Sequence, residues 1–170
     1  MSRIRQSFFT RPDVIEISRQ LLGKHIFTKI GRSELTGGII TETEAYAGPE
    51  DRASHAYGNR RTRRTETMFK RGGVAYVYLC YGMYPLFNIV TNKSDIPHAI
   101  LIRAIQPTHG IPTMLRRRRK IKLDRSVACG PGALCLALGI DLRQNGENLS
   151  GDKIWLEKRN LDLGASQIKA

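Results

Sequence analysis

The 170-residue sequence predicts one α+β domain built on a mainly antiparallel sheet with surrounding helices. Three observations support this class. Strand-like and helix-like segments are interspersed along the chain without the regular strand–helix alternation that builds a parallel sheet. Two β-branched and aromatic runs flank a short glycine-containing turn, which is typical of an antiparallel hairpin. No repeat or low-complexity linker divides the chain, so residues 1–170 are expected to form a single domain.

The first half of the chain predicts a helix followed by two strands. Thr10-Arg11-Pro12-Asp13 offers an N-cap residue, a proline in the first turn and an acid, and apolar residues at helical spacing follow. Strands are predicted from about His25 to Ile30 and from Gly38 to Ala45. Pro49-Glu50-Asp51 is expected to open a short helix that carries His55.

The second half predicts a hairpin, two more strands and a helix. The hairpin lies between residues 74 and 90, with Gly82 at its turn. Further strands are predicted at Ala99–Ile105 and Asp152–Glu157. Gly130-Pro131-Gly132 is expected to lead into a helix.

The chain is strongly basic. Lysine and arginine outnumber aspartate and glutamate by 28 to 15, which gives a net charge of +13. Such a field attracts polyanions, and nucleic acid is favoured over a membrane surface because no basic amphipathic helix with a large apolar face is evident. Apolar runs long enough for a signal peptide or a membrane span are also absent. We therefore expect a soluble protein, cytoplasmic and nucleoid-associated in a bacterium or nuclear in a eukaryote.

The three cysteines, Cys80, Cys129 and Cys135, are widely spaced and form no CxxC pair. This pattern is not that of a disulfide framework or a zinc site. The signatures of zinc deaminases, P-loop proteins, GxSxG hydrolases and HExxH metalloproteases are absent as well. Hydrolysis without a metal or cofactor is therefore the simplest chemistry for this chain.

Polar residues interrupt several of the predicted strands. Glu42, Glu44 and Tyr46 alternate along one strand and should therefore share one of its faces. Asn88 and Arg103 lie in two other apolar runs. Because a buried arginine or glutamate without a partner is costly, Arg103 is expected to pair with one of the glutamates. The pair is either a structural ion pair or a site in which an ionised carboxylate deprotonates a water molecule.

Aromatic residues could build a slot beside these acids. His55 placed near Tyr46 and Tyr78 would line a flat, electron-rich cavity suited to a nucleobase, particularly a cationic one. Tyr76 shares a strand face with Tyr78, and ordinary cross-strand packing explains at least one of the two equally well. The sequence alone does not distinguish an aromatic slot for a base from ordinary cross-strand packing.

Tyr81 lies beside Gly82 at the predicted hairpin tip, where it has little core to pack against. A side chain in that position could insert between base pairs and fill the space left by an extruded nucleotide. An exposed turn tyrosine with no such role is the alternative. Two basic stretches, residues 60–64 and 116–120, are solvated surface or phosphate contacts, and the net charge favours phosphate contact for at least one of them.

Several separate motifs follow one another along the chain. They are Thr43-Glu44-Ala45-Tyr46-x-Gly48-Pro49-Glu50-Asp51, Ala53-x-His55, Met68-Phe69, Tyr76-Val77-Tyr78-x-x-Tyr81-Gly82-Met83, Asn88 and Leu101-Ile102-Arg103-Ala104. In these motifs and in their order, nearly the whole chain resembles the monofunctional 3-methyladenine (alkyladenine) DNA glycosylase family.

The resemblance implies an enzyme that flips alkylated or deaminated purines out of duplex DNA and hydrolyses the N-glycosidic bond, which starts base excision repair. It implies a protruding β-hairpin that enters the minor groove, with Tyr81 as the intercalating residue. Glu44 matches the general base and Arg103 the residue that holds the water and the carboxylate. The expected partner is double-stranded DNA containing damaged purines, bound by a monomer without a cofactor, a metal or a membrane.

The remaining matches concern the base pocket. Tyr46, His55 and Tyr78 match the residues that sandwich and hydrogen-bond the damaged base, and Asn88 matches the residue that crowds a purine 2-amino group. Glu42 is a second candidate, for support rather than catalysis.

Arg52 and Ser54 depart from some relatives, which have smaller or acidic residues there. Two other functions stay open: a non-catalytic nucleic-acid binder, and a glycosylase with lyase activity through a lysine Schiff base. The constellation contains no lysine, and no lyase activity is expected.

Overall fold

The computed structural model describes residues 2–32, 34–159 and 164–169. Its centre is one sheet with the strand order β1-β7-β2-β3-β6-β5-β4, and every pairing in it is antiparallel. The strands are β1 (Ser2–Arg3), β2 (His25–Thr28), β3 (Thr36–Tyr46), β4 (Ala75–Cys80), β5 (Tyr84–Thr91), β6 (His98–His109) and β7 (Ile154–Lys158). The predicted α+β class with an antiparallel sheet is confirmed.

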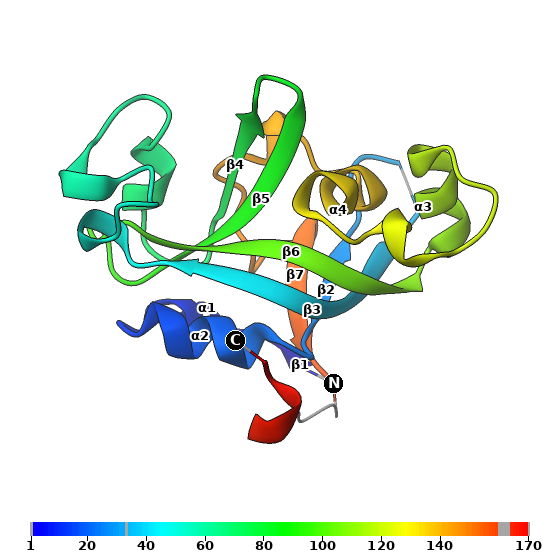
Figure 1. Ribbon diagram of the computed structural model, residues 1–170, viewed down its shortest axis with the longest axis horizontal. Helices are drawn as coiled ribbons and strands as arrows, with labels where there is room; N and C mark the ends of the chain where they lie inside the picture. Colours follow the sequence, from blue (N-terminus) through cyan, green and yellow to red (C-terminus); the bar gives the residue numbers. More distant parts are fainter. Residues whose placement is uncertain (1, 33, 160–163, 170) are drawn as a thin grey trace.

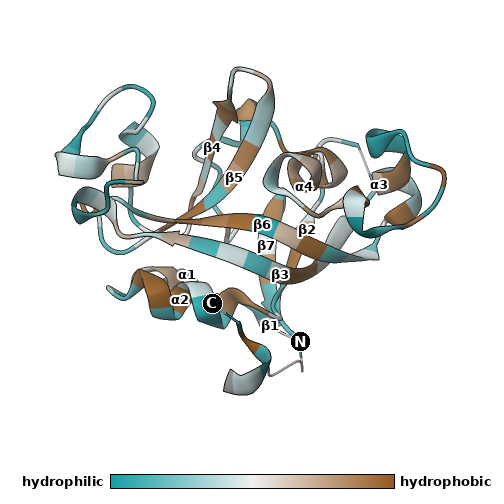
Figure 2. Cartoon of the chain, viewed as in Figure 1, coloured by the Kyte–Doolittle hydropathy of each residue, from teal (hydrophilic) through white to brown (hydrophobic). Residues whose placement is uncertain are grey.

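Helices cover both sides of the sheet, as Figure 1 shows. Helices α1 (Gln6–Phe9) and α2 (Val14–Leu21) lie on one side, whereas α3 (Ile111–Arg118) and α4 (Pro131–Leu138) lie on the other. Helix α2 packs against β3, and α4 packs against β5 and β6. The apolar colouring of β6 and α4 in Figure 2 marks this packed interior, while the loop that rises beside the β4–β5 hairpin is hydrophilic. None of the helices in the described residues is long and apolar enough to cross a bilayer.

Helix α2 forms where the sequence predicts it, although it begins at Val14 rather than near Thr10. The Asp13 carboxylate accepts a hydrogen bond of 2.9 Å from the Glu16 amide and caps the first turn. Ile17 and Leu21 are fully buried on the face that meets the sheet. The predicted helix after Gly130 is also confirmed, as α4.

Helix α3 was not predicted, because its last turn is Arg116-Arg117-Arg118 and resembles a solvated loop in sequence. Two of these arginines, Arg117 and Arg118, donate to carbonyl groups of neighbouring elements and so attach the last turn to the rest of the fold. The predicted short helix carrying His55 was wrong. Gly48–Glu50 and Tyr57–Asn59 form 3₁₀ turns, and His55 lies between them in a turn that brings it toward β4.

The hairpin of β4 and β5 protrudes from the sheet (Figure 1). At its tip Tyr81 and Gly82 both have positive φ, 50° and 69°, as a type I′ turn requires. Positive φ is unfavourable for a tyrosine, so the strained Tyr81 is held by the strand pairing on both sides. Its side chain is 90% exposed.

The pairing of β3 with β6 is interrupted beside the acidic residues. Glu42 pairs with Ala104 and Thr43 pairs with Ile102, so Arg103 is an extra residue on β6. A second shift leaves Thr41 unpaired on β3 between Ile40 and Glu42. Bulges of this kind redirect side chains and bend the strand. They place Arg103 against the acids of β3.

Candidate active site

Arg103 bridges the two glutamates of β3. Its Nε donates to Glu42 Oε1 at 2.8 Å, and its Nη1 donates to Glu44 Oε2 at 2.7 Å. The expected pairing with a glutamate is confirmed and extends to both carboxylates. The hydrogen bond to Glu42, together with the charges of both acids, raises the pKa of Arg103 above its ordinary value, against the opposing effect of desolvation.

The three charged side chains are only partly buried. The side chains of Arg103, Glu42 and Glu44 are 37%, 49% and 41% exposed. The neighbours of Arg103 on β6, Ile102 and Ala104, are buried, so the bulged Arg103 alone turns toward the partly exposed acids of β3. Ion pairs with this exposure contribute only about 0.2–1 kcal/mol each to folding stability, so stability alone gives little reason for the cluster.

Tyr46 links the glutamate to a cavity. Its hydroxyl donates to Glu44 Oε1 at 2.6 Å, so Glu44 accepts one bond on each oxygen. Burial and this hydrogen bond both raise the pKa of Tyr46, which therefore keeps its proton and remains a donor. Tyr46 is one of the residues that line the cavity, whereas Glu44 is not, and Glu44 is connected to the cavity through the Tyr46 hydroxyl.

The cavity is lined mainly by aromatic and small side chains that come from β3, β4, β5, β6 and the segment between β3 and β4. Its free volume is about 30 Å³, room for about two water molecules. The four residues expected to form a base pocket, Tyr46, His55, Tyr78 and Asn88, all line it. The lining also includes Ala53, Ser54, Met68, Tyr76 and Ala99.

The sequence did not reveal that Tyr76, which also lines the cavity, contacts His55. Its hydroxyl lies 3.0 Å from Nδ1 of His55, and its ring centroid lies 5.4 Å from that of Tyr78. The alternation of Tyr76 and Tyr78 on one strand was the available signal. The His55 ring meets Tyr78 edge-to-face at a centroid distance of 4.6 Å, so the three rings form one continuous wall.

The environment of this wall keeps His55 neutral at pH 7. Desolvation lowers the pKa of His55 below its ordinary value of about 6.5, and the nearby charge of Arg64 lowers it further. Burial also raises the pKa of Tyr76 to about 12, so the phenol stays protonated. A neutral imidazole and an uncharged phenol leave an aromatic surface on which a cation can be held.

Asn88 lies at the floor of the cavity and is almost completely buried. Its Nδ2 donates to the Tyr76 carbonyl at 3.2 Å, which fixes the amide orientation. Tyr81 does not line the cavity but stands at the exposed hairpin tip. Among the described residues no group of three histidine, cysteine, aspartate or glutamate side chains is arranged to hold a metal ion.

Comparisons with known proteins show which proteins this chain is similar to in sequence. The chain is 47% identical over 155 residues to a protein of Chlamydia abortus named "Putative 3-methyladenine DNA glycosylase", covering 91% of this chain and 81% of that protein. A protein of the same name from Clostridium novyi is 39% identical over 176 residues, covering 98% of this chain and 86% of that protein.

A family model described as methylpurine-DNA glycosylase matches residues 7–170. The matched range contains the Glu42–Arg103–Glu44 cluster, the aromatic cavity and the hairpin. The chain belongs to the methylpurine-DNA glycosylase family.

Proposed function

We propose that this protein is a monofunctional DNA-3-methyladenine glycosylase that starts base excision repair. It binds duplex DNA as a monomer, flips an alkylated or deaminated purine into the aromatic cavity and hydrolyses the N-glycosidic bond. Residues 1–170 act as one glycosylase domain. The observation that carries the proposal is the position of Glu44, bonded to Arg103 on one oxygen and to the cavity residue Tyr46 on the other.

Glu44 acts as the general base. Arg103 and Tyr46 each donate one hydrogen bond to its carboxylate, which leaves lone pairs on both oxygens to accept hydrogen bonds from a water molecule. As the water oxygen bonds to C1′ of the flipped nucleotide, Glu44 takes its proton. The C1′–N bond breaks, and its electron pair leaves with the base. The carboxylate also stabilises the oxocarbenium-like charge that develops on the sugar.

The aromatic wall selects the leaving base. Alkylation at a purine ring nitrogen makes the base cationic, which both weakens the glycosidic bond and favours stacking on Tyr46 and Tyr78. Neutral His55 does not repel such a base. The cavity is narrow, so its walls must separate to admit a purine. Asn88 at the floor limits the room for a 2-amino group and so disfavours normal guanine.

Arg103 orients the water together with Glu44, and Glu42 supports the arginine from its other side. No lysine is among the residues that line the cavity, so the chain offers no amine there for a Schiff base. Borohydride trapping on damaged DNA should therefore give no covalent adduct.

The proposal is tested with duplex oligonucleotides that each carry one lesion. 3-Methyladenine, 7-methylguanine, hypoxanthine and ethenoadenine are compared with undamaged duplex, and abasic products are detected by alkaline cleavage. Release of at least one alkylated base, with none from undamaged DNA, is expected. Binding without any release would instead support a non-catalytic nucleic-acid binder.

Replacing Tyr81 with serine should weaken stable base flipping more than non-specific binding. The side chain is 90% exposed and contributes little to the core, so folding stability should change by less than about 0.5 kcal/mol. Fluorescence of a flipped base analogue, compared with affinity for undamaged duplex, measures the difference. Equal losses on the two duplexes would make Tyr81 a surface contact only.

The pH dependence of lesion binding should follow His55. Because its pKa is lowered, the imidazole stays neutral from pH 8 down to about 6.5 and gains a proton only at lower pH. The affinity ratio of damaged to undamaged duplex is therefore expected to be constant above pH 6.5 and to fall below it for a cationic base. His55→Gln should remove this fall. A fall centred above pH 7, or one unchanged in the variant, would contradict the assignment.

A further inference from the structure

The two basic stretches of the chain differ in how their side chains are used. In the second stretch, Arg117 donates to the Ala137 carbonyl at 2.9 Å, and Arg118 donates to the Val127 carbonyl at 3.0 Å. Arg116 bonds to Thr113, and Lys120 pairs with Asp124. These contacts attach α3 to α4 and to the loop before it. Most of this stretch therefore has a structural use.

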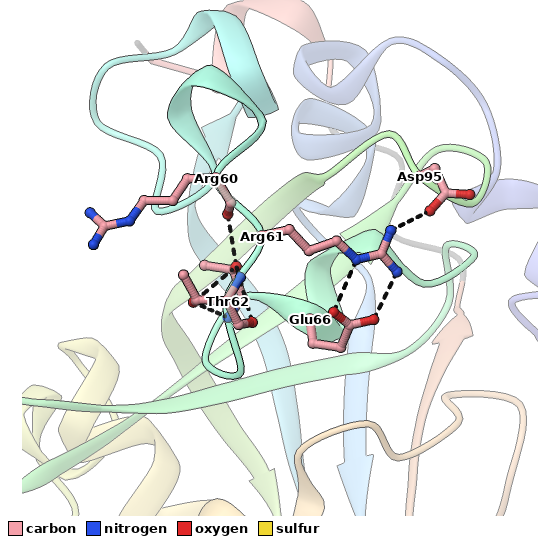
Figure 3. Close-up of polar contacts among 6 residues, drawn as sticks. Arg60, Arg61, Thr62, Glu66 and Asp95 are labelled. Atoms are coloured by element: carbon pink, nitrogen blue, oxygen red, sulfur yellow. Dashed lines mark hydrogen bonds and ion pairs between the residues drawn. The ribbon is translucent and has the colours of Figure 1, made fainter.

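In the first stretch Arg61 is used in this way, and Arg64 lies against the Tyr78 ring. It forms two hydrogen bonds to Glu66 and one to Asp95, and its guanidinium lies 4.8 Å from the Phe69 ring centroid (Figure 3). The neighbouring Arg60 extends away from these ion pairs in the same view. The Thr65 hydroxyl bonds to the Arg60 carbonyl at 2.8 Å and fixes its backbone. Arg61 thus holds the loop in place while Arg60 is presented to solvent.

A second cavity lies where this loop meets the base cavity. It has a volume of about 400 Å³, and its lining includes three arginines, Arg52, Arg60 and Arg64. The hydroxyl-bearing residues Ser54, Thr62 and Thr65 complete its polar wall, and the lining contains no acidic residue. Within the described part of the chain, neither the Arg52 nor the Arg60 guanidinium forms an ion pair. Three guanidinium groups around one hollow without a carboxylate favour a bound anion.

The position of this second cavity, called the arginine pocket below, indicates which anion it binds. It shares Ala53, Ser54 and His55 with the base cavity, so the two lie side by side. Arg64 connects them, because its guanidinium also lies 5.0 Å from the Tyr78 ring centroid. The loop that carries the pocket and the β4–β5 hairpin rise from the same side of the sheet (Figure 1). A nucleic-acid strand that places one base in the base cavity passes close to the arginine pocket.

We infer that the arginine pocket, formed by Arg52, Arg60 and Arg64, binds a backbone phosphodiester of the damaged strand next to the flipped nucleotide. The inference rests on the proposed function and adds a specific phosphate site to it. Guanidinium groups pair with phosphate oxygens in bidentate geometry. The bound phosphate fixes the strand beside the base cavity.

The test uses a duplex with a stable abasic-site analogue, so that binding is measured without base release. Each phosphate within three nucleotides of the analogue is replaced, one at a time, by an uncharged methylphosphonate. The double variant Arg52→Gln/Arg60→Gln is compared with the wild type. Arg63→Gln/Arg119→Gln is the matched control, because it removes the same charge from exposed arginines that do not line the pocket.

The wild type is expected to lose about tenfold in affinity at one phosphate in particular, and the double variant should lose about tenfold on the unmodified duplex. Replacing that phosphate by a methylphosphonate should cause no further loss of affinity for the double variant. The slope of log affinity against log salt should be smaller by about one in the double variant than in the wild type. The control should keep the sensitivity of the wild type at that position. A double variant that responds to every methylphosphonate as the wild type does would overturn the inference.

If the pocket instead binds a free anion, inorganic phosphate should bind the wild type tightly in the absence of DNA. That outcome would also overturn the inference. Base release by the wild type is measured separately on a lesion duplex. If the wild type released no base, the proposed function would be refuted. The dependence of binding on each phosphate would still test the inference.

Discussion

Replacing Glu44 with glutamine is expected to slow single-turnover release of an alkylated purine about a thousandfold and to leave lesion binding intact. The amide keeps the size of the side chain but cannot accept the proton of the attacking water, and general-base catalysis contributes about 10²–10⁴-fold. Release is measured with enzyme in excess over duplex, and binding is measured by fluorescence anisotropy. Both are compared with the wild type.

Glu42→Gln is the matched control for this variant. It removes a carboxylate that also bonds to Arg103 but does not contact Tyr46. A loss of no more than about tenfold is expected, because Glu42 acts through the arginine alone. If Glu44→Gln released base at the wild-type rate, or if Glu42→Gln were the slower variant, the assignment of the base would be wrong.

Replacing Arg103 with glutamine should slow base release about a hundredfold while changing folding stability by less than about 1 kcal/mol. The activity falls because the water and the Glu44 carboxylate lose their common donor. Stability changes little because the guanidinium is 37% exposed and both glutamates remain hydrated without it. Single-turnover rates and urea unfolding measure the two effects.

This pair of measurements separates the two interpretations of the ion pairs. A purely structural role would lower stability and leave the release rate of the folded protein unchanged. Arg103→Lys should recover little activity, because an ammonium group cannot donate to both carboxylates in the planar geometry of a guanidinium. A large loss of stability with normal catalysis would contradict the proposed role.

Much of the site follows from local sequence. The alternation of Glu42, Glu44 and Tyr46 predicts that they share a strand face, and all three lie near Arg103 or its partners. The polar Arg103 within an apolar run predicts an ionic partner. These predictions depend only on the two-residue period of a strand and on the cost of an unpaired charge.

Other features depend on contacts between distant segments. The bulges that let Arg103 reach both acids arise from the register of β3 against β6, which the local sequence of neither strand determines. The position of His55 is set by a turn after Gly48–Glu50 and by its bond to Tyr76, 21 residues away. Period-based reasoning does not detect such contacts.

The basic stretches show the same limit of prediction from local sequence, here for charged residues. Composition alone treats Arg61, Arg117 and Arg118 as equivalent surface charges, but each has specific partners in the fold. Helix α3 escaped prediction because its arginines bond to carbonyl groups that follow it by about ten or more residues in the chain. Only the folded arrangement distinguishes structural arginines from those presented to DNA.

The central claim is that water positioned by Glu44 attacks C1′ and displaces the base in a single step, which inverts the configuration at C1′. The most direct measurement is single-turnover excision in water containing methanol, followed by analysis of the methyl glycoside left in the DNA. The account predicts a single anomer with inverted configuration, formed by the wild type and nearly absent with Glu44→Gln. A mixture of both anomers, or equal formation by the variant, would contradict it.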